Sequence, residues 1–181
     1  GIYIWGAQLE TGSTATSYIT TVASTVTRAI DSAAMTGTNF SSWYNQSEGT
    51  FYAEFNASST IGAIVNFDDT GSATNRHAIN LTTATNLQSR SIVSGVAQCT
   101  LNQTVTAFPA FIKTCLSYNT DDFAAVSNGG TAAVDTSGTV PVVNTLRIGN
   151  NHNAAAAING TIKTIAYYPK ALPASLPALT S

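Results

Sequence analysis

Hydrophobic and polar residues alternate with a period of two along several short stretches of this chain, which is the pattern of half-buried β-strands. The clearest case is Phe111–Gly130, where two such runs are separated by the polar turn Asn119–Asp122. Asn128 and Gly129 follow the second run, and this dipeptide favours a tight hairpin because both of its residues tolerate positive φ. The stretch therefore predicts an antiparallel meander.

Similar alternation predicts strands on both sides of this meander. In chain order they are Val26–Ile30, Thr50–Asn56, Ile61–Phe67, the run marked by His77, Ile79 and Leu81, Leu87–Val93, Val96–Leu101, Thr145–Gly149 and Ile158–Tyr168. Asp31–Gly37 is expected to form one helical turn, and the proline-rich end of the chain at most a short helix. Many short strands with frequent turns predict an all-β sandwich of two antiparallel sheets.

The first 24 residues differ from the rest. Gly1–Glu10 reads as a strand that is apolar on both faces, so it is buried on both sides or belongs to another module. Thr11–Ser24 is rich in Thr, Ser, Gly and Ala and reads as an extended linker. We therefore predict that residues 1–24 end a preceding β-module and that residues 25–181 form the main domain.

Composition adds limits on partners. Apolar residues make up 44% of the 181 residues, which is enough for the core of one full domain. Charged residues make up only 9%, against roughly 25% in a typical domain, which suits a protein that contacts other subunits or lies outside a cell. The net charge of −2 and the absence of a basic run argue against a nucleic-acid partner. No apolar run approaches the ~20 residues of a transmembrane helix, so no membrane insertion is expected.

Several motifs resemble a domain type of tailed-phage structural proteins. Within Trp5–Asp31, the motifs WGAQLE, GSTATSYI and VTRAID resemble a segment that leads into a laminin-G-like domain of the concanavalin A-like lectin/glucanase superfamily. EGTFYAEF, KTCLSYNTDDFAAVSNGG, TLRIGN and INGTIKTIAYYPKAL match that domain type in the same order. The resemblance implies a jelly roll for residues 25–181, with the last strand beside the first. These motifs are structural rather than catalytic.

Part of the resembled superfamily hydrolyses glycans, with carboxylates at alternate positions of one strand in the pattern E-x-D-x-x-E. Retaining hydrolysis needs two carboxylates about 5–5.5 Å apart. Glu54 is the nearest candidate, but no acidic residue stands two positions after it, and Glu48 lies near the strand entry. The two histidines, His77 and His152, lie in no recognisable nucleophile context. We therefore expect a protein without catalytic residues.

Paired acids are the candidate metal ligands. Many laminin-G-like domains hold one Ca²⁺ at the rim of the sandwich, and calcium takes carboxylate and carbonyl oxygens. Asp68, Asp69, Asp121 and Asp122 are such pairs in predicted turns. Asp also favours turns for conformational reasons, so turns without a metal are the alternative. No other cofactor is expected.

The sequence leaves the state of Cys99 and Cys115 open. If the strands on either side of residue 107 form a hairpin, the two cysteines stand opposite one another, and a cross-strand disulfide is geometrically possible. A phage protein assembles in a reducing cytoplasm, which favours free, buried thiols.

Two loops carry the residue types of lectin sites, which use aromatic rings for stacking and amides for sugar hydroxyls. The candidate sugar-binding residues are Trp43, Tyr44 and Asn45 in one loop and Asn150, Asn151, His152 and Asn153 in the other. The alternative is that each loop only anchors the fold.

The resemblance implies a virion protein, assembled in the host cytoplasm, with other virion proteins as partners. The leading hypothesis is a tail-fibre or surface-appendage module that binds host-surface glycans. The alternatives are a decoration or capping subunit of the capsid or tail without a ligand, and a glycan hydrolase. A homo-oligomer is expected, with a trimer as the hypothesis.

Overall fold

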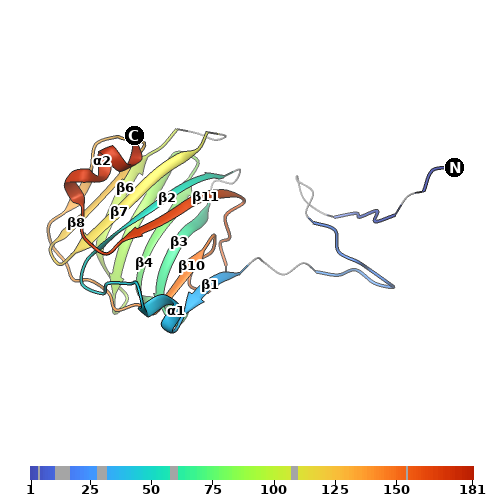
Figure 1. Ribbon diagram of the computed structural model, residues 1–181, viewed down its shortest axis with the longest axis horizontal. Helices are drawn as coiled ribbons and strands as arrows, with labels where there is room; N and C mark the ends of the chain where they lie inside the picture. Colours follow the sequence, from blue (N-terminus) through green and yellow to red (C-terminus); the bar gives the residue numbers. More distant parts are fainter. Residues whose placement is uncertain (4, 11–16, 28–31, 58–60, 107–109, 154) are drawn as a thin grey trace. The chain divides into compact units, whose positions relative to one another are not determined.

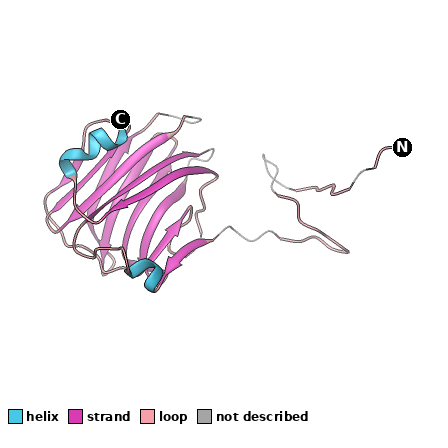
Figure 2. Ribbon diagram, in the orientation of Figure 1, coloured by secondary structure: helices cyan, strands magenta, loops and turns pink. Residues whose placement is uncertain are grey.

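The computed structural model describes residues 1–3, 5–10, 17–27, 32–57, 61–106, 110–153 and 155–181. The chain divides into two compact units, Gly1–Ile30 and Asp31–Ser181. The second unit contains two antiparallel sheets that pack face to face (Figure 1 and Figure 2). The prediction of an all-β, two-sheet antiparallel jelly-roll sandwich is therefore confirmed.

Both sheets are built from strands that are distant in the sequence. The six-stranded sheet has the order β1 (Ala33–Thr36), β10 (Thr145–Ile148), β3 (Gly62–Asp69), β4 (Ser72–Thr83), β5 (Asn86–Val93) and β6 (Val96–Thr104). The five-stranded sheet has the order β11 (Gly160–Tyr168), β2 (Gly49–Ala57), β7 (Ile112–Asn119), β8 (Asp122–Ser127) and β9 (Ala133–Asp135). The meander predicted around Asn128 and Gly129 is confirmed as β7, β8 and β9, and both turn residues have positive φ.

The core lies between the sheets because alternate side chains of each strand point inward. In β2, Phe51, Ala53 and Phe55 are buried while the residues between them are partly exposed. Phe51 meets Phe67 of β3 across the sandwich, with 4.0 Å between the ring centroids. The opposite face of the six-stranded sheet is left outside the core, and we call it the outer face.

A short C-terminal helix covers part of the five-stranded sheet. The 3₁₀ turn η1 (Pro173–Ser175) leads into α2 (Leu176–Thr180), in agreement with the short helix predicted. Leu176 packs with Cys115 and Val126, so β7 and β8 are buried on both faces here. In the described part of the chain, no helix has the length and apolar character needed to cross a membrane.

The first strand lies later than predicted. Val26 and Thr27 are in no strand, and residues 28–30 lie outside the described residues. β1 occupies part of Asp31–Gly37, where a helical turn was predicted, and the helix α1 follows it at Thr38–Ser41. All four side chains of β1 are exposed, so no alternation marks it, and pairing with β10 makes it a strand. The last strand, β11, pairs with β2 rather than with the first strand, so that prediction is wrong.

The hairpin that would bring the cysteines together does not form, because β6 and β7 belong to different sheets. Cys99 stands opposite Ser91, and Cys115 stands between Tyr52 and Val126. Both thiols are free and buried, and burial raises the pKa of Cys115 to about 12. The disulfide alternative is wrong, because consecutive strands here are not neighbours in one sheet.

The unit Gly1–Ile30 contains no strand in its described residues, so the strand predicted for Gly1–Glu10 is wrong. Ile2, Trp5 and Leu9 are 91%, 86% and 101% exposed. A strand needs a partner for its backbone hydrogen bonds, and the described part of this unit supplies none. That this segment ends a preceding β-module stays a prediction.

Candidate functional site

The first predicted sugar-binding loop closes one end of the core. Tyr44 is only 8% exposed and stacks on Phe40 and Phe67, with ring centroids 4.6 and 5.5 Å apart. Trp43 donates its indole N–H to a backbone carbonyl 2.6 Å away, and the backbone N–H of Asn45 donates to a tyrosine hydroxyl at 2.9 Å. These contacts favour the alternative in which the loop anchors the fold, while sugar binding by it stays a prediction.

The two acidic pairs lie on different sheets and hold local structure. The carboxylate of Asp68 is buried, with Oδ2 2.8 Å from Nε of Arg147. Asp69 accepts a hydrogen bond from a side-chain amide, and Asp121 accepts one from a backbone N–H, both at 2.9 Å. Asp122 begins β8. Within the described residues no three His, Cys, Asp or Glu side chains group as metal ligands. A Ca²⁺ site stays a prediction.

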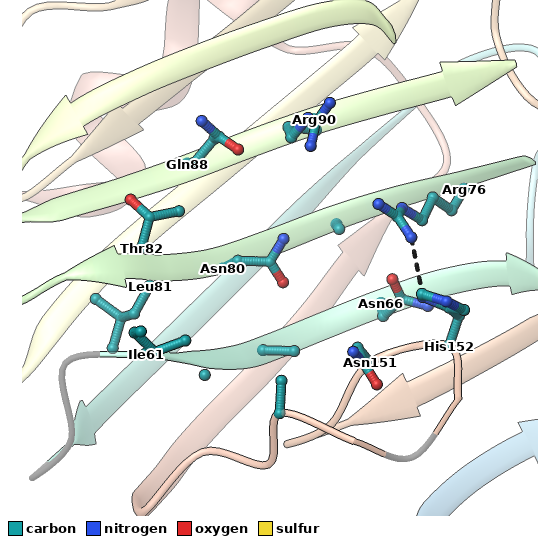
Figure 3. A pocket seen from close by; sticks show the side chains of 14 residues that line it. Ile61, Asn66, Arg76, Asn80, Leu81, Thr82, Gln88, Arg90, Asn151 and His152 are labelled. Carbon is teal, nitrogen blue, oxygen red and sulfur yellow. Dashed lines mark hydrogen bonds between the residues drawn. The ribbon is translucent and has the colours of Figure 1, made fainter. Parts of the chain in front are cut away.

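The outer face of the six-stranded sheet carries a hollow of about 360 Å³ over β3, β4 and β5 (Figure 3). We call it the sheet hollow. Its polar lining residues are Asn66, Arg76, Asn80, Thr82, Gln88, Arg90, Asn151 and His152. On β4 inward and outward positions alternate: His77 and Ile79 are buried on the core side, so Arg76, Ala78 and Asn80 point outward.

Small residues make room for the sheet hollow. Gly62, Ala63 and Ala78 lie among the lining residues and are buried, so the backbone of the sheet is close to the space. A Cβ added at Gly62 would meet the backbone Cα of Ile158 at 2.9 Å. The segment that leads into β11 therefore leaves no room for a side chain at Gly62.

The second predicted loop forms one wall of the sheet hollow. Asn151 and His152 line it, whereas Asn150 is fully buried beneath the loop. Asn151 and Asn153 both accept hydrogen bonds from the backbone N–H of Ala155, at 2.9 and 3.2 Å, which holds the loop in shape. Two of the four predicted residues thus reach the hollow, Asn153 holds the loop in shape, and Asn150 is buried.

His152 is neutral and positions an arginine. Nδ1 of His152 lies 2.9 Å from Nη1 of Arg76. Because a guanidinium only donates, Nδ1 must accept, and the ring proton is on Nε2. Burial lowers the pKa of His152, and the positive charge of Arg76 lowers it further. The ring therefore adds no positive charge at neutral pH.

Sequence reasoning missed the arginines and amides of the strands. Arg76, Asn80, Gln88 and Arg90 occupy outward positions of β4 and β5, which the alternation treats as ordinary surface. One feature of the sequence could have indicated a binding site: the outward positions of β4 combine a charged residue, an amide and the small Ala78. Only the pairing of β3, β4 and β5 brings these positions together on one face.

Comparison with known proteins supports the fold. No family model matches this sequence, and no curated protein matches it. The CBM40 of a Ruminococcus gnavus IT-sialidase, solved with bound α2,3-sialyllactose, superposes with a TM-score of 0.64 at 15% identity, covering 76% of this chain and 84% of that chain. A leech intramolecular trans-sialidase complexed with 2,7-anhydro-Neu5Ac gives 0.63 at 17% identity, over 75% of this chain and 23% of that chain. A SAP-like pentraxin from Limulus polyphemus gives 0.53 at 11% identity, over 69% and 65%. At these identities the likeness shows a lectin-like jelly roll and nothing finer.

Proposed function

We propose that the unit Asp31–Ser181 is a glycan-binding module that holds its ligand in the sheet hollow. The observation that carries this proposal is the combination of amide and guanidinium groups around a floor of small residues. Sugars present many hydroxyl groups, which accept from amides and guanidinium groups and donate to amide oxygens. Binding sites for small ligands are concave and combine apolar contact with a few polar groups that fix orientation.

The structural neighbours support the same assignment. A CBM40 carbohydrate-binding module with a similar fold was solved with bound sialyllactose. That module is not a catalytic domain, which is in keeping with a binding role for this chain. We propose that this protein is likewise not an enzyme. Glu54, the carboxylate nearest to the hydrolase pattern, is 2.7 Å from Nζ of Lys163 on the neighbouring strand β11, so it is engaged in an ion pair.

A glycan array with the whole chain tests this proposal. We expect binding to at least one class of glycan, and we expect Asn80→Ala to weaken it because this amide lies in the middle of the sheet hollow (Figure 3). Thr100→Ala is the matched control, since Thr100 stands opposite Arg90 on the next strand but outside the hollow. Binding that survives Asn80→Ala and is lost in a folded Trp43→Ala variant would place the site in the other loop. Turnover of a polysaccharide that disappears in Glu54→Gln would overturn the non-enzymatic assignment.

A more specific proposal concerns the assembly to which the module belongs. We propose that it belongs to a tailed-phage appendage that binds host-surface glycans, in contact with other virion proteins and in a homo-oligomer. The motifs within Trp5–Asp31 support this, and so do the exposed side chains of Ile2, Trp5 and Leu9, which a neighbouring subunit would cover. Light scattering on the whole chain should give a mass above that of one 18.7 kDa chain, and a trimer in particular. A monomer at high protein concentration would contradict the oligomer.

A further inference from the structure

The charges around the sheet hollow are not balanced. Arg76 and Arg90 line it, and no Asp or Glu is among the described residues that do so. Asp68 is the nearby carboxylate, but its Oδ2 is 2.8 Å from Nε of Arg147, a third arginine. These four residues together carry a formal charge of +2, whereas the whole chain carries −2. A net positive charge therefore lies around the sheet hollow, although the chain as a whole is negative.

The two lining arginines stand close together. Arg90 is paired with Ala78, which lies two positions after Arg76 on β4, so the arginines occupy diagonal positions on neighbouring strands. Diagonal neighbours on one face have Cβ atoms within about 8 Å, a distance that two long side chains easily bridge. The pKa of Arg76 is lowered by burial and also by the charge of Arg90. Two like charges are thus held near one another.

Hydrogen bonding at these arginines is incomplete. The Nε atoms of Arg76 and Arg90 are buried and have no hydrogen-bond partner in the described part of the chain. The bond from Arg76 to His152 uses Nη1 and leaves Nε unsatisfied. A buried donor without an acceptor is unfavourable, so the protein itself does not fully satisfy either guanidinium group. An anion that accepts from both groups would also relieve the repulsion between their charges.

We propose that the sheet hollow selects acidic saccharides, whose anionic group binds between Arg76 and Arg90. This inference rests on the proposed glycan-binding function and gives the class of ligand. The planar fork of a guanidinium matches the two oxygens of a carboxylate, and a sulfate offers the same acceptors. Asn80, Thr82 and Gln88, farther along the hollow, contact the sugar hydroxyls (Figure 3).

Calorimetric titration of the whole chain tests this inference with three probes: 3′-sialyllactose, 3′-sulfated lactose and lactose. We expect an acidic probe to bind about ten-fold or more tightly than lactose, and binding to weaken as salt rises. Arg76→Gln and Arg90→Gln should each weaken it by a similar factor, since each removes a charge-assisted contact. Lys163→Gln is the matched control, because it removes one positive charge on the other sheet, and it should leave affinity unchanged.

Arg90→Lys is a milder variant that keeps the charge and loses the fork, and it should bind more weakly than the unmodified protein. Comparison of the carboxylate and sulfate probes shows which anion is preferred, and dependence of either on both arginines supports the inference. The inference would be overturned if lactose and both acidic probes bound equally well and this binding survived Arg76→Gln and Arg90→Gln. Loss of the same binding in Asn80→Ala would leave the proposed function standing. Failure of every glycan on the array to bind would overturn both.

Discussion

Acid should destabilise this protein through one buried histidine, His77. It points inward from β4, is completely buried, and its Nδ1 lies 2.7 Å from the hydroxyl oxygen of Ser91. Its ring packs 4.4 Å from that of Tyr118, and its Nε2 has no hydrogen-bond partner among the described residues. Burial lowers the pKa of His77 to about 3. The folded protein therefore holds this imidazole in its neutral form.

The sign and size of the effect follow from linkage. In the unfolded chain the pKa of a histidine is about 6.5, so between pH 6.5 and 3 the unfolded state binds a proton that the folded state does not. The stability associated with the neutral ring is complete above pH 6.5 and is lost as pH falls towards 3. At pH 4.5 the loss is about 3 kcal/mol, which lowers the melting temperature of a domain of this size by roughly 6–12 °C.

Urea unfolding followed by circular dichroism between pH 7.5 and 4.5 measures this dependence. His77→Phe should flatten it, since a phenyl ring binds no proton, although its stability at pH 7.5 will be lower because Ser91 loses a partner. The difference in unfolding free energy between the two proteins should therefore change by about 1.4 kcal/mol per pH unit below 6.5. His152→Gln is the control and should keep most of the slope, because His152 is only partly buried. Identical slopes for the unmodified protein and His77→Phe would refute the reasoning.

Two further predictions concern packing and charge. Leu176→Ala should lower the unfolding free energy by about 2–5 kcal/mol, because Leu176 is fully buried. In this variant a thiol reagent should label Cys115, which α2 covers, before it labels Cys99. Equal protection of the two cysteines would contradict this prediction. Arg147→Met should cost about 3–5 kcal/mol in the same assay, since it leaves the buried carboxylate of Asp68 without its ion pair; an unchanged midpoint in urea would show that the pair is dispensable.

Local alternation located most strands but not the edge of the sheet. Phe51, Ala53 and Phe55 face the core as predicted, because a strand packed on one side must separate its apolar and polar residues. β1 lacks this separation, since it lies at the edge with exposed side chains, and only pairing with β10 makes it a strand. The alternative that set Cys99 opposite Cys115 was wrong for a related reason, since the chain changes sheets between β6 and β7, and both thiols are free.

The candidate site was predicted only in part. The loop with Asn151 and His152 was identified from its composition, and both residues line the sheet hollow. Arg76 and Arg90 were not identified, because isolated arginines at outward strand positions carry no local signal. They become a site when β4 and β5 pair and Ala78 leaves space beside them.

By itself the sequence determined the class of fold, since period-two alternation with frequent turns can bury its apolar half only between two sheets. It also determined that charge is scarce. The tertiary structure decided which strands are neighbours, because backbone hydrogen bonds join strands far apart in the chain. That pairing places two arginines at diagonal positions on one face of the sheet, beside a floor of small residues, and so it decided where the proposed site lies.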